Sequence, residues 1–300
     1  MGFEVSDRAK EINERLEAFM EEYIYPRERD YDEFTNDQNN LWQYPDWYEE
    51  LKEEAKKQEL WNLFLPKEYA PWSPGLTNLE IAGLFETMSR SAWSQQIFNC
   101  NAPDRGNMEV LAKYGTPEQQ KQWLEPLLAG EIRSAYAMTE PDVASSDATN
   151  MELEITRDGD EYVLNGQKIW TSTAHISDWI FCLVRTEPEA PKHQGISFLL
   201  FEMNTPGIDV RPLVDMTGTA NFNEVFFTDV RVPKDQIVGQ RGQGWQVANA
   251  ILGHERGSLA PPDAAMSRLN GVVKLMQQET ISGERVIDNP IFRDRLLKLQ

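Results

Sequence analysis

The chain has 300 residues, and its composition, 40% hydrophobic and 26% charged, is that of a folded protein. Its length allows one large domain or two to three smaller ones. Lysine and arginine number 29 against 49 acidic residues, which gives a net charge of −20. Such a chain is repelled by nucleic-acid phosphates and by anionic lipid, so neither is expected as a partner, although a local site can still bind an anionic ligand.

The chain has too few cysteines and histidines for a zinc site or a metal centre built from several histidines. The chain has two cysteines, Cys100 and Cys182, far apart in sequence, and three histidines. Neither spacing predicts a zinc site, so no metal site is expected and two free thiols in a reducing compartment are predicted. The N-terminus lacks the features of a signal or transit peptide, and no apolar stretch is long enough to span a membrane. A cytoplasmic location is therefore expected.

Residues 1–132 have the apolar spacing of helices and are predicted to form an N-terminal helical domain. Ser6 and Asp7 can begin a helix that Pro26 ends or kinks. Thr116-Pro117-Glu-Gln119 places Thr at the N-cap, Pro at the first helical position and Gln at the third, and this helix is expected to end near Gly130. Other helices are expected over residues 46–60, 77–88 and 108–114.

Residues 133–238 change to an alternating pattern and are predicted to form a compact antiparallel β domain. Arg157-Asp158-Gly159-Asp160 predicts a turn, and Asn165-Gly166 is the strongest hairpin signal in the chain. Strands are expected over residues 151–156, 162–164, 179–185, 196–203, 208–212 and 224–232.

Residues 239–300 return to helical spacing. A helix is expected after Gly244, another from Arg256 to Gln278 with a break at Pro261-Pro262, and a third from Pro290. The last one reaches Gln300 without a C-cap, so this region is interpreted as the start of a C-terminal helical domain that is incomplete. The predicted fold class is α+β, with an N-terminal helical domain, a central antiparallel β domain and a C-terminal helical domain.

Two segments carry the most specific motifs. Residues 136–147 read Tyr-Ala-Met-Thr-Glu-Pro-Asp-Val-Ala-Ser-Ser-Asp, and residues 165–185 begin Asn-Gly-Gln-Lys-Ile-Trp-Thr-Ser. Both resemble the loops that hold FAD in the acyl-CoA dehydrogenase family, whose order of helices, β domain and helices is also similar to that expected here. The resemblance implies an acyl-CoA dehydrogenase-like fold and FAD as cofactor.

The resemblance implies a role for residues of both segments in holding FAD. The main-chain groups of Tyr136, Met138 and Thr139 and the hydroxyl of Thr139 would bond the pyrimidine end of the flavin. Fixed donors there stabilise the negative charge that the flavin gains when it is reduced. In the step Trp170-Thr171-Ser172, the Trp would cover one side of the ring, and the hydroxyl residue would bond its edge near N5.

The Ser145-Ser146 pair is similar to the family's Ser-Asp step, which meets the FAD phosphates and can also touch substrate. One residue is inserted here relative to the common Gly-Ser-Asp pattern. Which serine makes the contact stays open, and Ser146 is the one expected to reach substrate as well.

Residues 253–256, Gly253-His254-Glu255-Arg256, resemble the helix segment that lines the acyl and CoA entrance. One branch of the family has its catalytic carboxylate at the position of Glu255, whereas other branches have it on a later helix. The base is therefore Glu255 or a residue beyond Gln300, and pairing with an arginine is the alternative role of Glu255. Arg285 occupies the place of an arginine that reaches the FAD of a neighbouring subunit.

The implied activity is FAD-dependent α,β-desaturation of an acyl-CoA thioester, by α-proton abstraction and hydride transfer to flavin N5. The implied partners are acyl-CoA and an electron acceptor such as an electron-transfer flavoprotein, in a homodimer or homotetramer. Three alternatives remain open: an acyl-CoA oxidase, a flavin monooxygenase on the same fold, and a non-catalytic relative that binds flavin or acyl-CoA.

Overall fold

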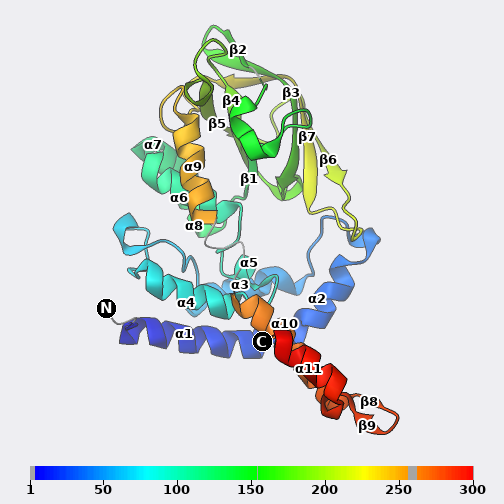
Figure 1. The fold of residues 1–300 in the computed structure, drawn as a ribbon. Coiled ribbons are helices and arrows are strands. Elements are labelled where there is room, and N and C mark those ends of the chain that lie inside the picture. The colour runs from blue at the N-terminus through cyan, green and yellow to red at the C-terminus, as the bar shows by residue number, and fades with distance from the viewer. Residues whose placement is uncertain (1–3, 154, 256–261, 300) are drawn as a thin grey trace.

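The computed structural model describes residues 4–153, 155–255 and 262–299. Helices form the N-terminal part, two β-sheets follow, and helices return at the end of the chain (Figure 1). The fold class predicted from the sequence is thus confirmed. The helices before the first strand are α1 Asp7–Phe19, α2 Glu28–Thr35, α3 Trp47–Lys57, α4 Asn78–Met88, α5 Ser94–Ile97, α6 Asp104–Tyr114, α7 Pro117–Gln119 and α8 Glu125–Ala129.

The ends of these helices follow the capping signals in the sequence. The Ser6 hydroxyl accepts a hydrogen bond from the Ala9 N–H at the start of α1. Thr116 and Gln119 form a reciprocal capping box at the start of α7. Gly130, with φ of +75°, ends α8 in the left-handed conformation that a C-terminal glycine adopts easily. The predicted starts at Ser6 and Thr116 and the end near Gly130 are confirmed.

Seven strands form two sheets between residues 134 and 233. The first sheet has the order β1-β4-β5, and the second has the order β2-β3-β7-β6. The strands are β1 Ser134–Ala137, β2 Ile155–Asp158, β3 Glu161–Ser172, β4 Trp179–Arg185, β5 Ile196–Glu202, β6 Ile208–Leu213 and β7 Phe222–Pro233.

One strand pair departs from the antiparallel arrangement expected from the sequence. β1 runs parallel to β4, whereas β4–β5 and the pairs of the second sheet are antiparallel. The chain between β1 and β4 passes through β2 and β3 in the other sheet. This crossover connection allows β4 to lie beside β1 in the same direction, because parallel neighbours need a crossover and cannot be joined by a tight hairpin.

The prediction of a hairpin turn at Asn165-Gly166 is wrong. Both residues lie inside β3, at a register shift where the strand passes β7, and the β2–β3 turn lies at Gly159 instead. The Asn165 amide donates to Asp229 Oδ1 at 3.0 Å and its oxygen accepts from the Asp229 N–H at 2.8 Å. These bonds join the strands across a bulge, where Gly166 adopts a φ of +145°. The Asn-Gly pair therefore marks a bulge in this chain.

Strand β4 is central because both of its faces are buried. Phe181 and Leu183 face the helices, while Ile180, Cys182 and Val184 face the second sheet. A strand covered on both sides needs an unbroken apolar sequence, which explains the run Ile-Phe-Cys-Leu-Val. Residues of the second sheet that meet it in one core are Leu164, Val225, Phe227, Val230 and Val232.

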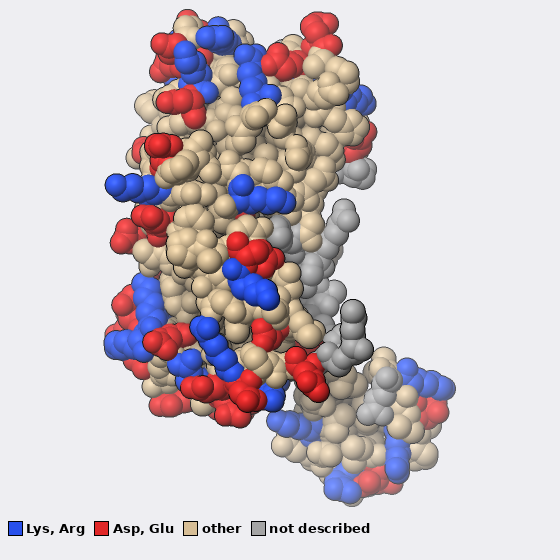
Figure 2. Space-filling model, turned by 90° about the vertical axis from the view of Figure 1, so that its left-hand side faces the viewer, with Lys and Arg blue, Asp and Glu red and all other residues tan. Residues whose placement is uncertain are grey.

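The C-terminal elements begin against the sheet and then leave it. Helix α9, Gly244–Glu255, packs on α6 and β5. Helix α10, Pro262–Gln278, contacts α4, and the following elements extend away from the rest of the molecule as a lobe (Figure 1 and Figure 2). These elements are the short strands β8 Thr280–Ile281 and β9 Glu284–Arg285, and α11, Pro290–Leu299. The expected helix from Pro290 is confirmed, and residues 256–261 of the expected preceding helix lie outside the described residues. Within the described ranges, no helix has the length and apolar character needed to span a membrane.

Replacing Gly244 with alanine should destabilise the protein by about 1–3 kcal/mol, because the sheet leaves no room for a side chain there. A Cβ at Gly244 would lie 2.4 Å from the Ser197 carbonyl carbon and 2.7 Å from the Phe198 nitrogen. The control is Gly271→Ala in α10, where a Cβ meets nothing within 4 Å and helix propensity should add about 1 kcal/mol. Urea denaturation of both variants measures the effect, and equal stabilities would contradict the packing described.

Candidate functional site

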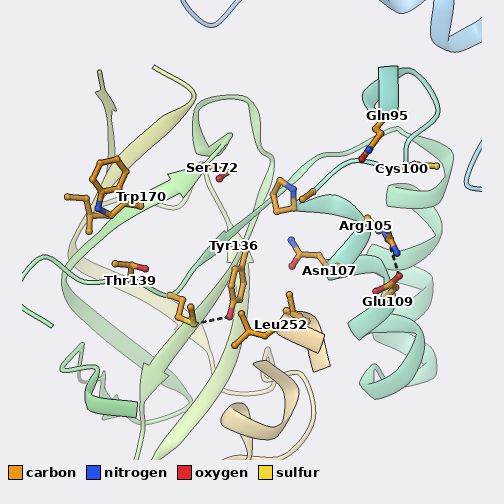
Figure 3. A pocket seen from close by; sticks show the side chains of 16 residues that line it. Gln95, Cys100, Arg105, Asn107, Glu109, Tyr136, Thr139, Trp170, Ser172 and Leu252 are labelled. Atoms are coloured by element: carbon orange, nitrogen blue, oxygen red, sulfur yellow. Dashed lines mark hydrogen bonds and ion pairs between the residues drawn. The ribbon is translucent and has the colours of Figure 1, made fainter. Parts of the chain in front are cut away.

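A cavity of about 350 Å³ lies between the β-sheets and helices α6 and α9. Its sheet side is formed by Tyr136 of β1, by Met138 and Thr139 just after β1, and by Ile169, Trp170 and Ser172 of β3. Figure 3 shows Tyr136, Thr139, Trp170 and Ser172 around one space. All of these except Ile169 were predicted as cofactor residues from the sequence, and the fold brings them to one wall from two separate segments of the chain.

The helix side of the cavity was not predicted. It is formed by Ile251 and Leu252 of α9, and by residues of α5, α6 and the turn between them: Gln95, Cys100, Ala102, Pro103, Arg105, Gly106, Asn107 and Glu109 (Figure 3). The only signal for these residues in the sequence is helical spacing, which does not reveal which helix will face the sheet. Burial raises the pKa of Cys100 to about 12, so the cavity presents a neutral thiol and not a nucleophilic thiolate.

Helix α6 is tied to β1 by two buried polar side chains. The Asp104 carboxylate accepts from the Arg133 Nε at 2.6 Å and from the Ser134 N–H at 2.7 Å. The Asn107 amide donates to the Ser134 hydroxyl at 2.9 Å and to the Ala135 carbonyl at 3.3 Å. These bonds set the distance between the helix wall and β1, the strand that carries Tyr136.

The segment after β1 is fixed to β3 by main-chain and side-chain bonds. The Ile169 N–H donates to the Thr139 carbonyl at 2.9 Å. The fully buried Lys168 ammonium donates to the Met138 carbonyl at 3.0 Å and to Glu140 Oε1 at 2.7 Å. Lys168 has no place on the cavity wall, so it holds the wall from behind.

Trp170 is held in an unusual backbone conformation. Its φ is +58°, and the β3–β7 register shifts between Lys168 and Thr171, where β3 has one residue more than β7. A bulge changes the direction of the side chain at that position. A positive φ is a conformation that non-glycine residues rarely adopt. The indole is 52% exposed beside the cavity and meets the Phe222 ring edge-on, with ring centroids 5.7 Å apart. An exposed aromatic held under strain is typical of a binding site.

Several predicted site residues lie off this wall. Thr171 is buried in β3, and its hydroxyl has no hydrogen-bond partner among the described residues. Ser145 and Ser146 begin a short turn of residues 145–150, and only their backbone is described. Gly253 is exposed near the end of α9.

The candidate base is only partly described. His254 and Glu255 are the last two residues of α9, and their side chains are not described; Arg256 lies outside the described residues. Position 255 follows Ile251 by four residues, so it shares the helix face that lines the cavity. In the described ranges, no group of three or more His, Cys, Asp or Glu side chains could hold a metal ion.

Comparison with known protein families gives two matches that follow each other along the chain. The N-terminal domain of acyl-CoA dehydrogenases matches residues 6–131, and the middle domain of acyl-CoA dehydrogenases matches residues 135–230. Together they cover the N-terminal helices and both sheets, including the segments on the sheet side of the cavity.

Individual relatives agree with these matches. Acyl-CoA dehydrogenase family member 10 of Mus musculus is 44% identical over 84% of this chain and 24% of its own length. The probable acyl-CoA dehydrogenase FadE2 of Mycobacterium tuberculosis is 43% identical over 85% of this chain and 63% of its own length. The chain thus spans a quarter of the first relative and somewhat under two thirds of the second.

The structure of a putative acyl-CoA dehydrogenase from Mycobacterium abscessus superimposes with a TM-score of 0.90 and 38% identity. The alignment covers 98% of this chain and 76% of that one. A glutaryl-CoA dehydrogenase from Mycobacterium smegmatis, solved in complex with FADH2, has a TM-score of 0.77 at 19% identity, covers 98% of this chain and 72% of that one, and shows the shared fold alone.

Replacing Trp170 with asparagine should give a more stable protein than replacing it with phenylalanine, by about 1 kcal/mol, because asparagine tolerates the positive φ better. Both variants remove the indole, and only phenylalanine keeps a ring that can pack on Phe222, so greater stability of the asparagine variant would show that backbone strain outweighs that contact. Urea denaturation of the two variants checks it. If the phenylalanine variant is equally stable, backbone strain at position 170 does not outweigh that contact.

Proposed function

The chain belongs to the acyl-CoA dehydrogenase family, and from this membership we propose that it binds FAD and desaturates an acyl-CoA thioester between its α and β carbons. The observation that carries the proposal is the convergence of Tyr136, Met138, Thr139, Trp170 and Ser172 on one cavity wall. These are the positions that the family resemblance assigns to the flavin ring, and they come from two separate segments of the chain.

The chemistry of this wall suits a flavin. Trp170 offers an aromatic face that is half exposed, and Ser172 offers a hydroxyl next to it. The Thr139 N–H has no hydrogen-bond partner among the described residues, so it is available as a donor. Bound FAD would supply N5 as the acceptor of the β-hydrogen as hydride. The wall would orient the ring and exclude water from its face.

The remaining cofactor contacts rest on the family resemblance. Ser145 and Ser146 are proposed to meet the FAD phosphates, with Ser146 also near the substrate. Thr171 is buried between two wall residues, so its proposed part is to hold Trp170 and Ser172 in place.

The proposed base for removal of the α-proton is Glu255. Its position at the end of α9 shares a face with Ile251 of the cavity wall, so a base at this position would come from the helix side of the cavity. The resemblance also allows a base on a later helix of the family's fold. Gly253, His254 and Arg256 are proposed to line the entrance for the acyl-CoA.

The wider organisation is proposed from the same resemblance. We assign residues 1–132 to an N-terminal helical domain, 133–238 to the β domain that carries the flavin loops and 239–300 to the start of a C-terminal helical domain. The proposed electron acceptor is an electron-transfer flavoprotein, and the proposed assembly is a homodimer or homotetramer. The free, buried thiols of Cys100 and Cys182 support a reducing compartment such as the cytoplasm.

Visible absorption spectroscopy tests the activity. Protein reconstituted with FAD should show flavin bands that bleach on anaerobic addition of an acyl-CoA and return only slowly in air. Rapid return in air would indicate an oxidase, and flavin bands that no acyl-CoA bleaches would indicate a non-catalytic relative. Absence of flavin bands after reconstitution would contradict the proposal as a whole.

Replacing Glu255 with glutamine should lower turnover at least about 100-fold while FAD stays bound, because an amide cannot accept the α-proton. Single-turnover bleaching by acyl-CoA measures the effect in the variant and the unchanged protein. The control is Glu202→Gln, an exposed carboxylate at the end of β5, which should react normally. Near-normal bleaching in the Glu255 variant would assign the base to another residue.

A further inference from the structure

We propose that Lys168 is a positioning residue that turns the Thr139 N–H into the cavity, and that it thereby sets how much more tightly the site binds reduced than oxidised FAD. The inference rests on the proposed binding of FAD. It assigns a role to a buried ion pair, Lys168–Glu140, that has no direct place on the cavity wall.

The Lys168 ammonium is held in one position by two acceptors. Its side chain is 0% exposed, and it donates to the Met138 carbonyl at 3.0 Å and to Glu140 Oε1 at 2.7 Å. The Glu140 carboxylate cannot move away, because it also accepts from the Glu152 N–H at 2.6 Å and from the Leu153 N–H at 3.0 Å. The ammonium therefore fixes the direction of the Met138 carbonyl.

Peptide planarity carries this direction to the next residue. The carbonyl of Met138 and the N–H of Thr139 belong to one planar trans unit and point in opposite directions. With the carbonyl on Lys168, behind the wall, the N–H points away from Lys168 and towards the cavity that Met138 and Thr139 line. The following peptide is also fixed, since the Thr139 carbonyl accepts from the Ile169 N–H at 2.9 Å.

A fixed donor aimed at the cavity discriminates between ligand charge states. Reduction of a flavin adds negative charge at the pyrimidine end, near N1 and O2, and a donor fixed in advance stabilises that charge without reorganising. If the Met138–Thr139 peptide were free to rotate, the site would favour the reduced form less. Lys168 acts through this peptide and does not touch the ligand.

The test compares the dissociation constants of oxidised and reduced FAD in Lys168→Met, measured anaerobically by flavin fluorescence and by titration with reduced FAD. Their ratio should change by about tenfold in favour of the oxidised form, which corresponds to a fall of about 30 mV in the midpoint potential of the bound two-electron couple. A residue with a purely structural role would weaken both forms equally and leave the ratio unchanged.

Two further variants separate geometry from charge and from stability. Lys168→Met with Glu140→Gln removes both buried charges, so it should fold more readily than the single variant, and the ratio should still change. Thr77→Ala breaks the capping box with Glu80 at the start of α4, and neither residue lines the cavity. This variant should have a lower melting temperature than the unchanged protein but the same ratio of the dissociation constants of oxidised and reduced FAD.

Two results for the ratio of dissociation constants would overturn the role proposed for Lys168. A wild-type ratio in the double variant would overturn the proposal, because the effect would then be one of net charge and not of peptide orientation. A wild-type ratio in a folded Lys168→Met protein would overturn it as well. If the unchanged protein bound neither form of FAD, the proposed function would fail, and that result is distinct from a failure of the role of Lys168.

Discussion

The bonds between the segment after β1 and the middle of β3 are the constraint on which the candidate site depends. β1 belongs to the three-stranded sheet and β3 to the four-stranded sheet, and they meet through the Ile169–Thr139 main-chain bond and the Lys168 ammonium. This seam holds two parts of the cavity wall in register. Because the Lys168–Glu140 pair behind the wall is buried, a ligand in the cavity would meet peptide groups that are already oriented, and such preorganisation is what makes fixed dipoles effective.

The seam also explains how β3 can bear strain at Trp170. A left-handed non-glycine residue costs about 1–3 kcal/mol, and it persists where surrounding structure determines it. Pairing with β7 continues on both sides, Lys168 opposite Val225 and Thr171 opposite Asn223, so the strain falls on one residue. The bulge turns the indole out of the sheet to the cavity edge. On the opposite wall, the Asp104 and Asn107 bonds hold α6 at a fixed distance from β1.

The sequence predicted the parts of this structure that local patterns determine. Capping residues such as Ser6 and Thr116 placed helix ends correctly, because a cap is made within one turn. The wall residues Thr139 and Trp170 were found through motif resemblance. Asn165-Gly166 misled, because the same pair that suits a hairpin also suits a bulge, and the choice depends on Asp229 in a distant strand. The helix wall around Asn107 was missed, since helical spacing does not determine which face meets a sheet.

The proposed function requires the flavin ring to lie in the cavity between the β1–β3 seam and helices α6 and α9. A crystal structure of the chain grown with FAD would show where the ring binds. The ring should lie beside Trp170, with its pyrimidine end within hydrogen-bonding distance of the Thr139 N–H. A second cavity of about 410 Å³, lined by Trp42 and His175 among others, lies near Ser172. A ring found in that cavity, or away from the seam, would show that the cavity beside Trp170 is not the flavin site.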